Sequence, residues 1–213
     1  MSVRTLVIDT ATEACSVALF DDAALVAGQW EMLKRGHAER LIPMIAELPE
    51  RGRAERIWAN CGPGSFTGLR VGLAAARALA LAWDAELSGY TTHALVAAMA
   101  FDRFSGAADA EIVMTGGHGE WFVQAFGIDG AALDALASLP PAIAIERSPR
   151  TLIAGSMADA ASEQGMRGDP LLLWPDARQA MLMPPESRNL PPDPVYGRSP
   201  DAKPQASIVA GNG

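Results

Sequence analysis

The sequence is poor in the residues that build metal centres and disulfide frameworks. It contains two cysteines and three histidines among 213 residues. Cys15 and Cys61 lie among apolar and small residues, which is typical of packed thiols in a reducing compartment. His37 has Leu41 four residues on, where a helical metal site would place its second histidine. No metal site is therefore predicted.

Excess positive charge and a membrane-spanning run are also missing. The formal net charge is −8 at pH 7, and the arginines within residues 51–56 are interleaved with glutamates. Nucleic-acid phosphates are bound by clustered Lys and Arg, so this composition argues against unaided binding of RNA or DNA. The nearly uncharged run 71–83 is interrupted by Arg77 and is too short to cross a bilayer. Because no charged-then-apolar leader follows Met1, we expect a cytoplasmic chain without membrane association.

Catalytic constellations are equally scarce. No nucleophile elbow accompanies the histidines, so no Ser-His-Asp arrangement can be assigned, and no paired-carboxylate motif is present. His118 stands in a glycine-rich turn and is interpreted as an ordinary turn residue. A binding or scaffolding role is therefore favoured over catalysis.

Residues 60–83, NCGPGSFTGLRVGLAAARALALAW, are the most organised stretch. Glycines and a proline prevent regular structure in its first half, and Ser65 and Thr67 offer oxygens that can cap a helix. The spacing then predicts a helix over 68–83 with two stripes. The apolar stripe consists of Leu69, Leu73, Ala76, Ala80 and Trp83. The stripe of mostly small residues consists of Gly68, Gly72, Ala75, Leu79 and Ala82.

Three interpretations of this stretch stay open. Both helix faces can be covered within the chain, since a helix that is apolar nearly all round needs cover on more than one side. Alternatively, the small-residue stripe is an intermolecular interface, because small residues let two helix backbones approach closely. A third interpretation makes the glycine-rich loop a phosphate cradle. Leu69 follows Gly68 at the position where a Walker motif carries lysine, which weakens that third interpretation.

The first 101 residues predict one complete α/β lobe. Its elements are strands at 6–8, 15–20 and 25–30, a helix at 35–48, a strand at 56–60, a helix at 68–83, a strand at 87–90 and a helix at 94–101. The first strand ends at Asp9, and a threonine-rich turn with Thr10 and Thr12 follows it. Such a turn lies beside metal-bound phosphate in folds of the actin and hexokinase kind. These three residues are therefore candidate nucleotide-binding residues; the alternative is that Asp9 only makes turn hydrogen bonds.

The second half is less regular. Residues 112–115 and 121–126 predict a hairpin, 143–145 and 151–154 are candidate strands, 157–163 is a weak helix, and 177–183 forms at most two helical turns. A proline-rich segment follows, with one apolar anchor at 195–196. We predict an N-terminal lobe at 1–101, a smaller lobe at 102–183 and a wrapping or loose tail at 184–213.

Three segments of the sequence resemble the TsaB (YeaZ) family of bacteria. They are VIDTATEACSVALF at 7–20, RGHAERLIPMI at 35–45 and GPGSFTGLRVGLAAARALAL at 62–81; GEWFVQ at 119–124 and DPVYGR at 193–198 look like more variable motifs of that family. The resemblance is strong over residues 3–100 and patchy to residue 126. It implies an α/β fold of the actin-like ATPase kind (ASKHA, ribonuclease H-like) with two lobes, the second one reduced.

The resemblance also implies a function, namely an accessory role in forming threonylcarbamoyladenosine (t6A) at position 37 of tRNAs that read ANN codons. Family members act as a non-catalytic scaffold for the metal-containing paralogue TsaD, which transfers the threonylcarbamoyl group, and the ATPase TsaE joins them. A homodimer is implied for the isolated chain, and tRNA is reached only through the complex. No cofactor of its own is implied, although ATP or ADP can lie at a partner interface.

In the family, two helices of the first lobe pair with equivalent helices of TsaD or of a second copy. This carries over to residues 37–48 and 68–83. The interface residues so implied are His37, Leu41, Met44, Ile45, Gly64, Gly68, Arg70, Gly72, Ala75, Ala76, Leu79 and Trp83.

Two alternative functions remain open, and the sequence differs from the family pattern in one region. The alternatives are a small actin-like nucleotidase or kinase that uses Asp9 and a glycoprotease-like peptidase. The departure is in the second lobe, where Thr115-Gly116-Gly117-His118 replaces an Asp-Ala-Arg segment of relatives and the C-terminal region is shortened and proline-rich. Any contact of that lobe with nucleotide or with TsaE is affected by this departure.

Overall fold

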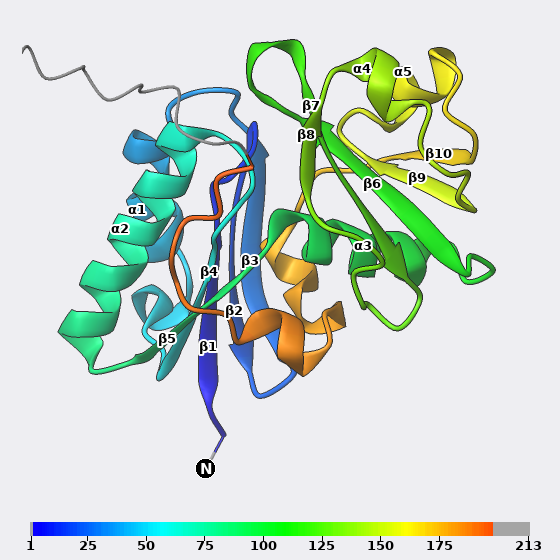
Figure 1. Ribbon diagram of the computed structural model, residues 1–213. Coiled ribbons are helices and arrows are strands. Elements are labelled where there is room, and N and C mark those ends of the chain that lie inside the picture. The colour runs from blue at the N-terminus through cyan, green and yellow to red at the C-terminus, as the bar shows by residue number, and fades with distance from the viewer. Residues whose placement is uncertain (1, 198–213) are drawn as a thin grey trace, which may run out of the picture.

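The computed structural model describes residues 2–197, which form two lobes (Figure 1). Each lobe is built on one five-stranded mixed sheet, with strand orders β3-β2-β1-β4-β5 and β10-β9-β6-β7-β8. Helix α3 (Thr92–Arg103) lies between the sheets and contributes to a core cluster with residues from both, such as Val7, Phe20, Ile112 and Phe126. The two lobes therefore share this central cluster, and each lobe also has a core cluster of its own.

The first sheet follows the predicted order of elements. Its strands are β1 (Arg4–Asp9), β2 (Ala14–Asp21), β3 (Ala24–Met32), β4 (Arg56–Asn60) and β5 (Glu86–Tyr90). The first three strands are antiparallel neighbours, whereas β4 and β5 run parallel to β1. Parallel neighbours need a long crossover connection, and α2 (Phe66–Trp83) provides it between β4 and β5. The predicted fold of the N-terminal lobe is confirmed.

Helix α1 (His37–Ala46) packs beside α2 on the same face of this sheet (Figure 1). It begins after Gly36, whose φ of 89° is a left-handed conformation that suits glycine. The helix has ten residues and retains Pro43 in its interior, so it is shorter at both ends than the predicted 35–48. A 3₁₀ helix (Pro49–Gly52) then leads toward β4.

The second sheet contains β6 (Asp109–Thr115), β7 (Trp121–Gly127), β8 (Ala137–Leu139), β9 (Leu152–Gly155) and β10 (Asp169–Leu172), with short helices α4 (Pro141–Ala144) and α5 (Ala158–Glu163). The predicted β6–β7 hairpin is confirmed. The candidate strand at 143–145 is wrong, because prolines 140 and 141 begin a helix there. Strands β8 and β10 were not predicted, since one has three residues and the other begins with Asp-Pro.

After the second sheet, the chain returns to the first lobe. Backbone Ala177 donates to the Ser16 hydroxyl on β2 at 2.9 Å, and the Trp30 indole on β3 donates to the Pro175 carbonyl at 3.2 Å. The 3₁₀ helices Ala177–Leu182 and Pro185–Arg188 therefore lie against the first sheet and α3. The sequence analysis assigned residues 177–183 to the second lobe, whereas these contacts show that they pack on the first lobe.

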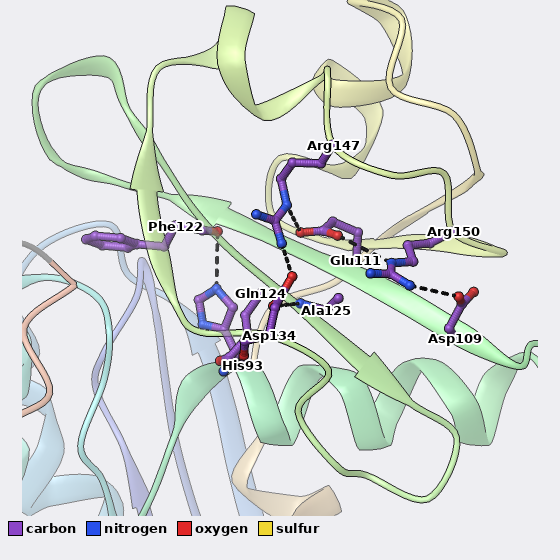
Figure 2. Close-up of polar contacts among 9 residues, drawn as sticks. All are labelled: His93, Asp109, Glu111, Phe122, Gln124, Ala125, Asp134, Arg147 and Arg150. Atoms are coloured by element: carbon purple, nitrogen blue, oxygen red, sulfur yellow. Dashed lines mark hydrogen bonds and ion pairs between the residues drawn. The ribbon is translucent and has the colours of Figure 1, made fainter.

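A chain of five charged side chains fastens the loops of the second lobe to β6 (Figure 2). Glu111, whose side chain is 2% exposed, accepts from Arg147 at 2.7 Å and lies 3.8 Å from Arg150. Arg147 also contacts Asp134, and Arg150 contacts Asp109 at 3.3 Å. Burial raises the pKa of Glu111 despite both arginines. The buried carboxylate thus depends on its cationic neighbours.

We predict that Arg147→Ala lowers the free energy of unfolding by about 3–5 kcal/mol, because it leaves a buried carboxylate without its close partner. The matched control is Arg56→Ala, which removes an exposed pair with Glu86 and should cost under about 1 kcal/mol. Urea denaturation of both variants measures the difference. Equal losses in the two variants would contradict the structural role assigned to this network.

Candidate functional site

Asp9 is the centre of a buried hydrogen-bond network at the carboxyl ends of β1 and β4. Its side chain is 1% exposed; Oδ1 accepts from backbone Ala11 at 3.2 Å, and Oδ2 accepts from Asn60 Nδ2 at 2.6 Å and from the Tyr90 hydroxyl at 3.0 Å. Burial raises the pKa of Asp9 to about 6, although these three donors oppose the shift. The carboxylate therefore connects three strands.

Both threonines of the predicted nucleotide turn are buried, but they differ in whether they border a cavity. Thr10 is buried and donates its hydroxyl proton to the Gly68 carbonyl on α2 at 2.7 Å. Thr12 accepts from backbone Ala14 at 3.3 Å and lines the cleft between the lobes. Asp9 and Thr10 do not line that cleft. Of the three candidate nucleotide residues, only Thr12 borders a space that a ligand could occupy.

The cleft between the lobes has a volume of about 1210 Å³. The first turns of α1 and α2 open into it, together with Lys34, Arg35 and Arg70, and with Glu13 and Glu39 as acidic members of the lining. The Thr115–His118 turn of the second lobe forms part of the opposite side. Helix N-termini and cationic side chains favour anions, so the chemistry of this cleft suits an anionic ligand better than a cation.

The glycines of the small-residue stripe of α2 face inward, against the turn that follows β1, whereas Ala75 and Leu79 are partly exposed and Ala82 is exposed. A Cβ atom at Gly64 would meet the Ala11 carbonyl, and one at Gly68 or Gly72 would meet Thr10. Gly68 and Gly72 are buried, as is Ala76 on the same helix. The prediction of an uncovered interface is therefore wrong for Gly68, Gly72 and Ala76, because the glycines allow α2 to approach the chain's own turn.

The residues implied on α1 are also mostly core residues. Leu41, Met44 and Ile45 are at most 3% exposed and pack with the first sheet. His37 is 9% exposed, with Nε2 3.3 Å from the Ala14 carbonyl. These side chains position α1 and are not available to a partner. Among the remaining residues of the implied set, Arg70 is exposed, and Gly64, Ala75, Leu79 and Trp83 are partly exposed.

The outward face of α2 carries an exposed apolar stripe that the sequence did not single out. Leu81 is 88% exposed and Phe66 is 52% exposed, and on the neighbouring α1 Ile42 is 51% exposed. The stripe, here called the outer face, is completed by exposed Thr67, Ala74, Ala78 and Ala82. From Ala74 to Ala82 these positions recur every three or four residues and form one strip, and the exposed Arg70 lies between this strip and Phe66. By length and composition alone, α2 is also apolar enough to cross a membrane, with 28% of it buried.

Contiguous exposed apolar surface marks sites of interaction. The outer face differs from the predicted one by a rotation about the helix axis, and only Ala82 belonged to a predicted stripe. Ala74, Ala78 and Leu81 have helical spacing in the sequence, but so do the members of the two predicted stripes. A helix that is apolar nearly all round gives no sequence cue as to which stripe is turned outward.

Comparison with known proteins relates this structure to proteins of tRNA modification. The sequence model of the family described as "TsaD: tRNA N6-adenosine threonylcarbamoyltransferase" matches residues 31–144, which is more than half of the chain. The matched region contains α1, α2 and α3 and therefore includes the outer face.

Curated relatives carry the name tRNA threonylcarbamoyladenosine biosynthesis protein TsaB. The protein of Escherichia coli (strain K12) is 40% identical over 95 residues, which cover 42% of this chain and 41% of that protein. The protein of Haemophilus influenzae is 36% identical over 106 residues, covering 46% and 43%. The chain thus spans about two fifths of the length of the curated relatives that it matches.

Solved structures extend the likeness to nearly the whole chain. YeaZ from Pseudomonas aeruginosa superposes with a TM-score of 0.75 at 26% identity and covers 91% of this chain and 99% of its own. The ethanolamine utilization protein EutJ from Carboxydothermus hydrogenoformans, at 14% identity and a TM-score of 0.50, shows the fold alone. The predicted α/β fold of the actin-like ATPase class is confirmed, and the chain belongs to the TsaB (YeaZ) family.

Proposed function

We propose that this chain acts in t6A biosynthesis as a partner subunit that has no catalysis of its own. It docks a TsaD-type chain through the outer face of α2, and TsaE and tRNA join through that complex. The isolated chain pairs with a second copy through the same face, in the cytoplasm. The names of the TsaB relatives and the TsaD family model support the pathway. The single observation that carries the docking role is the exposed apolar strip of α2.

Docking through this strip is favourable for two physical reasons. Burying a large apolar side chain such as Leu81 or Phe66 contributes about 1.5–3 kcal/mol. The alanines between them have short side chains, so the backbone of a partner helix can approach α2 closely. Because the TsaD family model covers α1 to α3 of this chain, a TsaD-type partner has helices that correspond to them. Such related surfaces can pair face to face, as in isologous dimers.

The contacts made by Asp9, the one candidate catalytic carboxylate, support the accessory role. All the hydrogen-bonding demands of Asp9 are met by neighbouring donors, so it points at no substrate. Within residues 2–197, no three His, Cys, Asp or Glu side chains are grouped closely enough to hold a metal ion. His118, in the turn after β6, lines the cleft.

A second candidate function is nucleotide binding, and the cleft between the lobes is the observation that favours it. Lys34, Arg35 and two helix N-termini line this space, and Thr12 borders it. Calorimetric titration with Mg-ATP tests the candidate. Heat that disappears in an Arg35→Ala variant would support a nucleotide at this cleft, and no heat from the purified chain would leave docking as the function.

Leu81→Glu should abolish docking without unfolding the chain, because Leu81 is almost fully exposed and a glutamate there would be desolvated in the complex. We expect at least a roughly tenfold loss of affinity for purified TsaD and a shift of the isolated chain to monomer in sedimentation velocity. The control is Leu25→Glu, which changes an exposed leucine on β3, away from α2. Wild-type docking by Leu81→Glu would refute the proposed interface.

Asp9→Asn separates a structural role from a catalytic one. Asn60 Oδ1 already accepts from backbone Gly62 at 2.7 Å and from Thr92 at 3.1 Å, so the Asn60 amide cannot turn, and its donor would face the new one. We expect a loss of about 1–3 kcal/mol in unfolding free energy. The exposed Asp84→Asn is the matched control and should be neutral. Unchanged stability together with lost Mg-ATP heat would instead indicate a catalytic carboxylate.

The raised pKa of Asp9 also predicts a pH dependence. The folded state holds this proton up to about pH 6, whereas the ordinary pKa of an aspartate, which applies to the unfolded chain, is 3.8. The Asp9 contribution to stability is therefore largest below about pH 4 and falls as pH rises to about 6. The stability difference between wild type and Asp9→Asn should shrink over this interval, which urea titrations at several pH values would measure. A difference independent of pH would contradict the buried, protonatable Asp9.

A further inference from the structure

The end of the described chain runs back along the first lobe as an extended segment. Residues 189–197, here called the strap, lie beside β5 and α2 (Figure 1, orange to red). Leu190 exchanges two backbone hydrogen bonds with Gly89 on β5, at 2.7 and 3.0 Å. Backbone Val195 donates to the Cys61 carbonyl at 2.7 Å, and its side chain packs on the core of the first lobe.

The strap passes close to two glycines of the first lobe, at positions where a side chain would collide with its backbone. A Cβ atom at Gly62 would lie 2.7 Å from the Val195 carbonyl oxygen, and one at Gly89 would lie 3.1 Å from the Pro191 carbonyl oxygen. Both distances are shorter than ordinary contacts of a Cβ atom. The path of the strap is therefore fixed by backbone fit as well as by its hydrogen bonds, and its side chains are presented at defined places along α2.

Strap residues contact Arg77 directly, and they contact the Phe66 ring on which the guanidinium of Arg70 lies. Arg77 Nη2 donates to the Pro192 carbonyl at 2.7 Å and to Asp193 Oδ1 at 3.0 Å. The guanidinium of Arg70 lies 3.6 Å from the ring centroid of Phe66, and that ring contacts Tyr196 with centroids 5.4 Å apart. Each cation on the outward side of α2 is thus engaged within the chain before any partner arrives.

In the isolated chain the Arg77–Asp193 pair contributes little to stability. The two side chains are 51% and 76% exposed, and exposed pairs of this kind are worth about 0–1 kcal/mol. Docking over the outer face changes this, because water is removed from the helix surface. Removing water from a cation that has no anionic partner costs several kcal/mol of binding free energy. The cost is smaller when the cation is hydrogen-bonded to a carboxylate.

We propose that the strap is part of the docking surface and that Asp193 neutralises Arg77 in advance, so that an apolar partner helix can bury the outer face. The proposal rests on the proposed function, and its occupant is the same TsaD-type chain. The chemistry required of that partner is an apolar helix face without an acidic group opposite Arg77, since the strap already supplies the carboxylate.

A double-mutant cycle tests the proposal through affinity for purified TsaD. We expect Asp193→Ala to weaken docking roughly tenfold or more, because Arg77 is then buried unpaired. In an Arg77→Met background, where no charge needs a partner, the same change should have no effect. Glu86→Ala is the matched control; it breaks a similarly exposed pair with Arg56, on β4 and β5, and should leave docking unchanged. Thermal denaturation should be the same for all of these variants.

The outcomes distinguish failure of the strap proposal from failure of the proposed docking function. Wild-type affinity of Asp193→Ala overturns the role of the strap, and the docking function stands if Leu81→Glu still fails to bind. Equal losses from Asp193→Ala in the wild-type and Arg77→Met backgrounds also overturn it, because the effect would then not pass through the arginine. If Leu81→Glu and Asp193→Ala both bind TsaD with wild-type affinity, the proposed interface and the role of the strap are both refuted.

Discussion

The close approach of α2 to the turn after β1 is the constraint on which the rest of the structure depends. The glycines at 64, 68 and 72 leave no room for a side chain between the helix and residues Thr10 and Ala11. Thr10 completes the contact by a hydrogen bond to the Gly68 carbonyl. This contact fixes the rotation of α2 about its own axis. It thereby decides which apolar stripe enters the core and which one meets solvent.

The hydrogen bonds of Asp9 fix the position of the turn that α2 packs against. Asp9 ties the end of β1 to Asn60 and Tyr90 on the parallel strands, so the turn that receives α2 cannot shift independently of the sheet. A carboxylate placed here to bind phosphate would need free oxygens facing the cleft, whereas this one satisfies buried donors. In this chain, the strand-end aspartate of an actin-like fold accepts hydrogen bonds from buried groups of its own lobe, and the helix beside it carries the exposed strip that we propose as the docking surface.

The sequence predicts the fold of the first lobe well and the candidate interface poorly, for physical reasons. Strand periodicity and the glycine-rich turn locate β1 to β5 and α1 to α3, because each element buries a face that its pattern reveals. Helix α2 is apolar on both faces, so its pattern cannot distinguish Gly72, which is buried, from Leu81, which is exposed. Strands β8 and β10 are too short to show a period. Tertiary contact, and not local preference, decides all these cases.

The strap shows how a segment without regular structure can complete such a face. Its predicted apolar anchor is confirmed for Val195, which packs into the first lobe. Its prolines cannot supply the hydrogen bonds of a sixth strand, so only Leu190 pairs with β5, and the segment is free to turn toward α2. There it meets Arg77, beside the outer face, and Phe66, which belongs to that face. A surface helix with two cations needs counterparts before it can be buried, and the returning chain supplies one of them as a carboxylate.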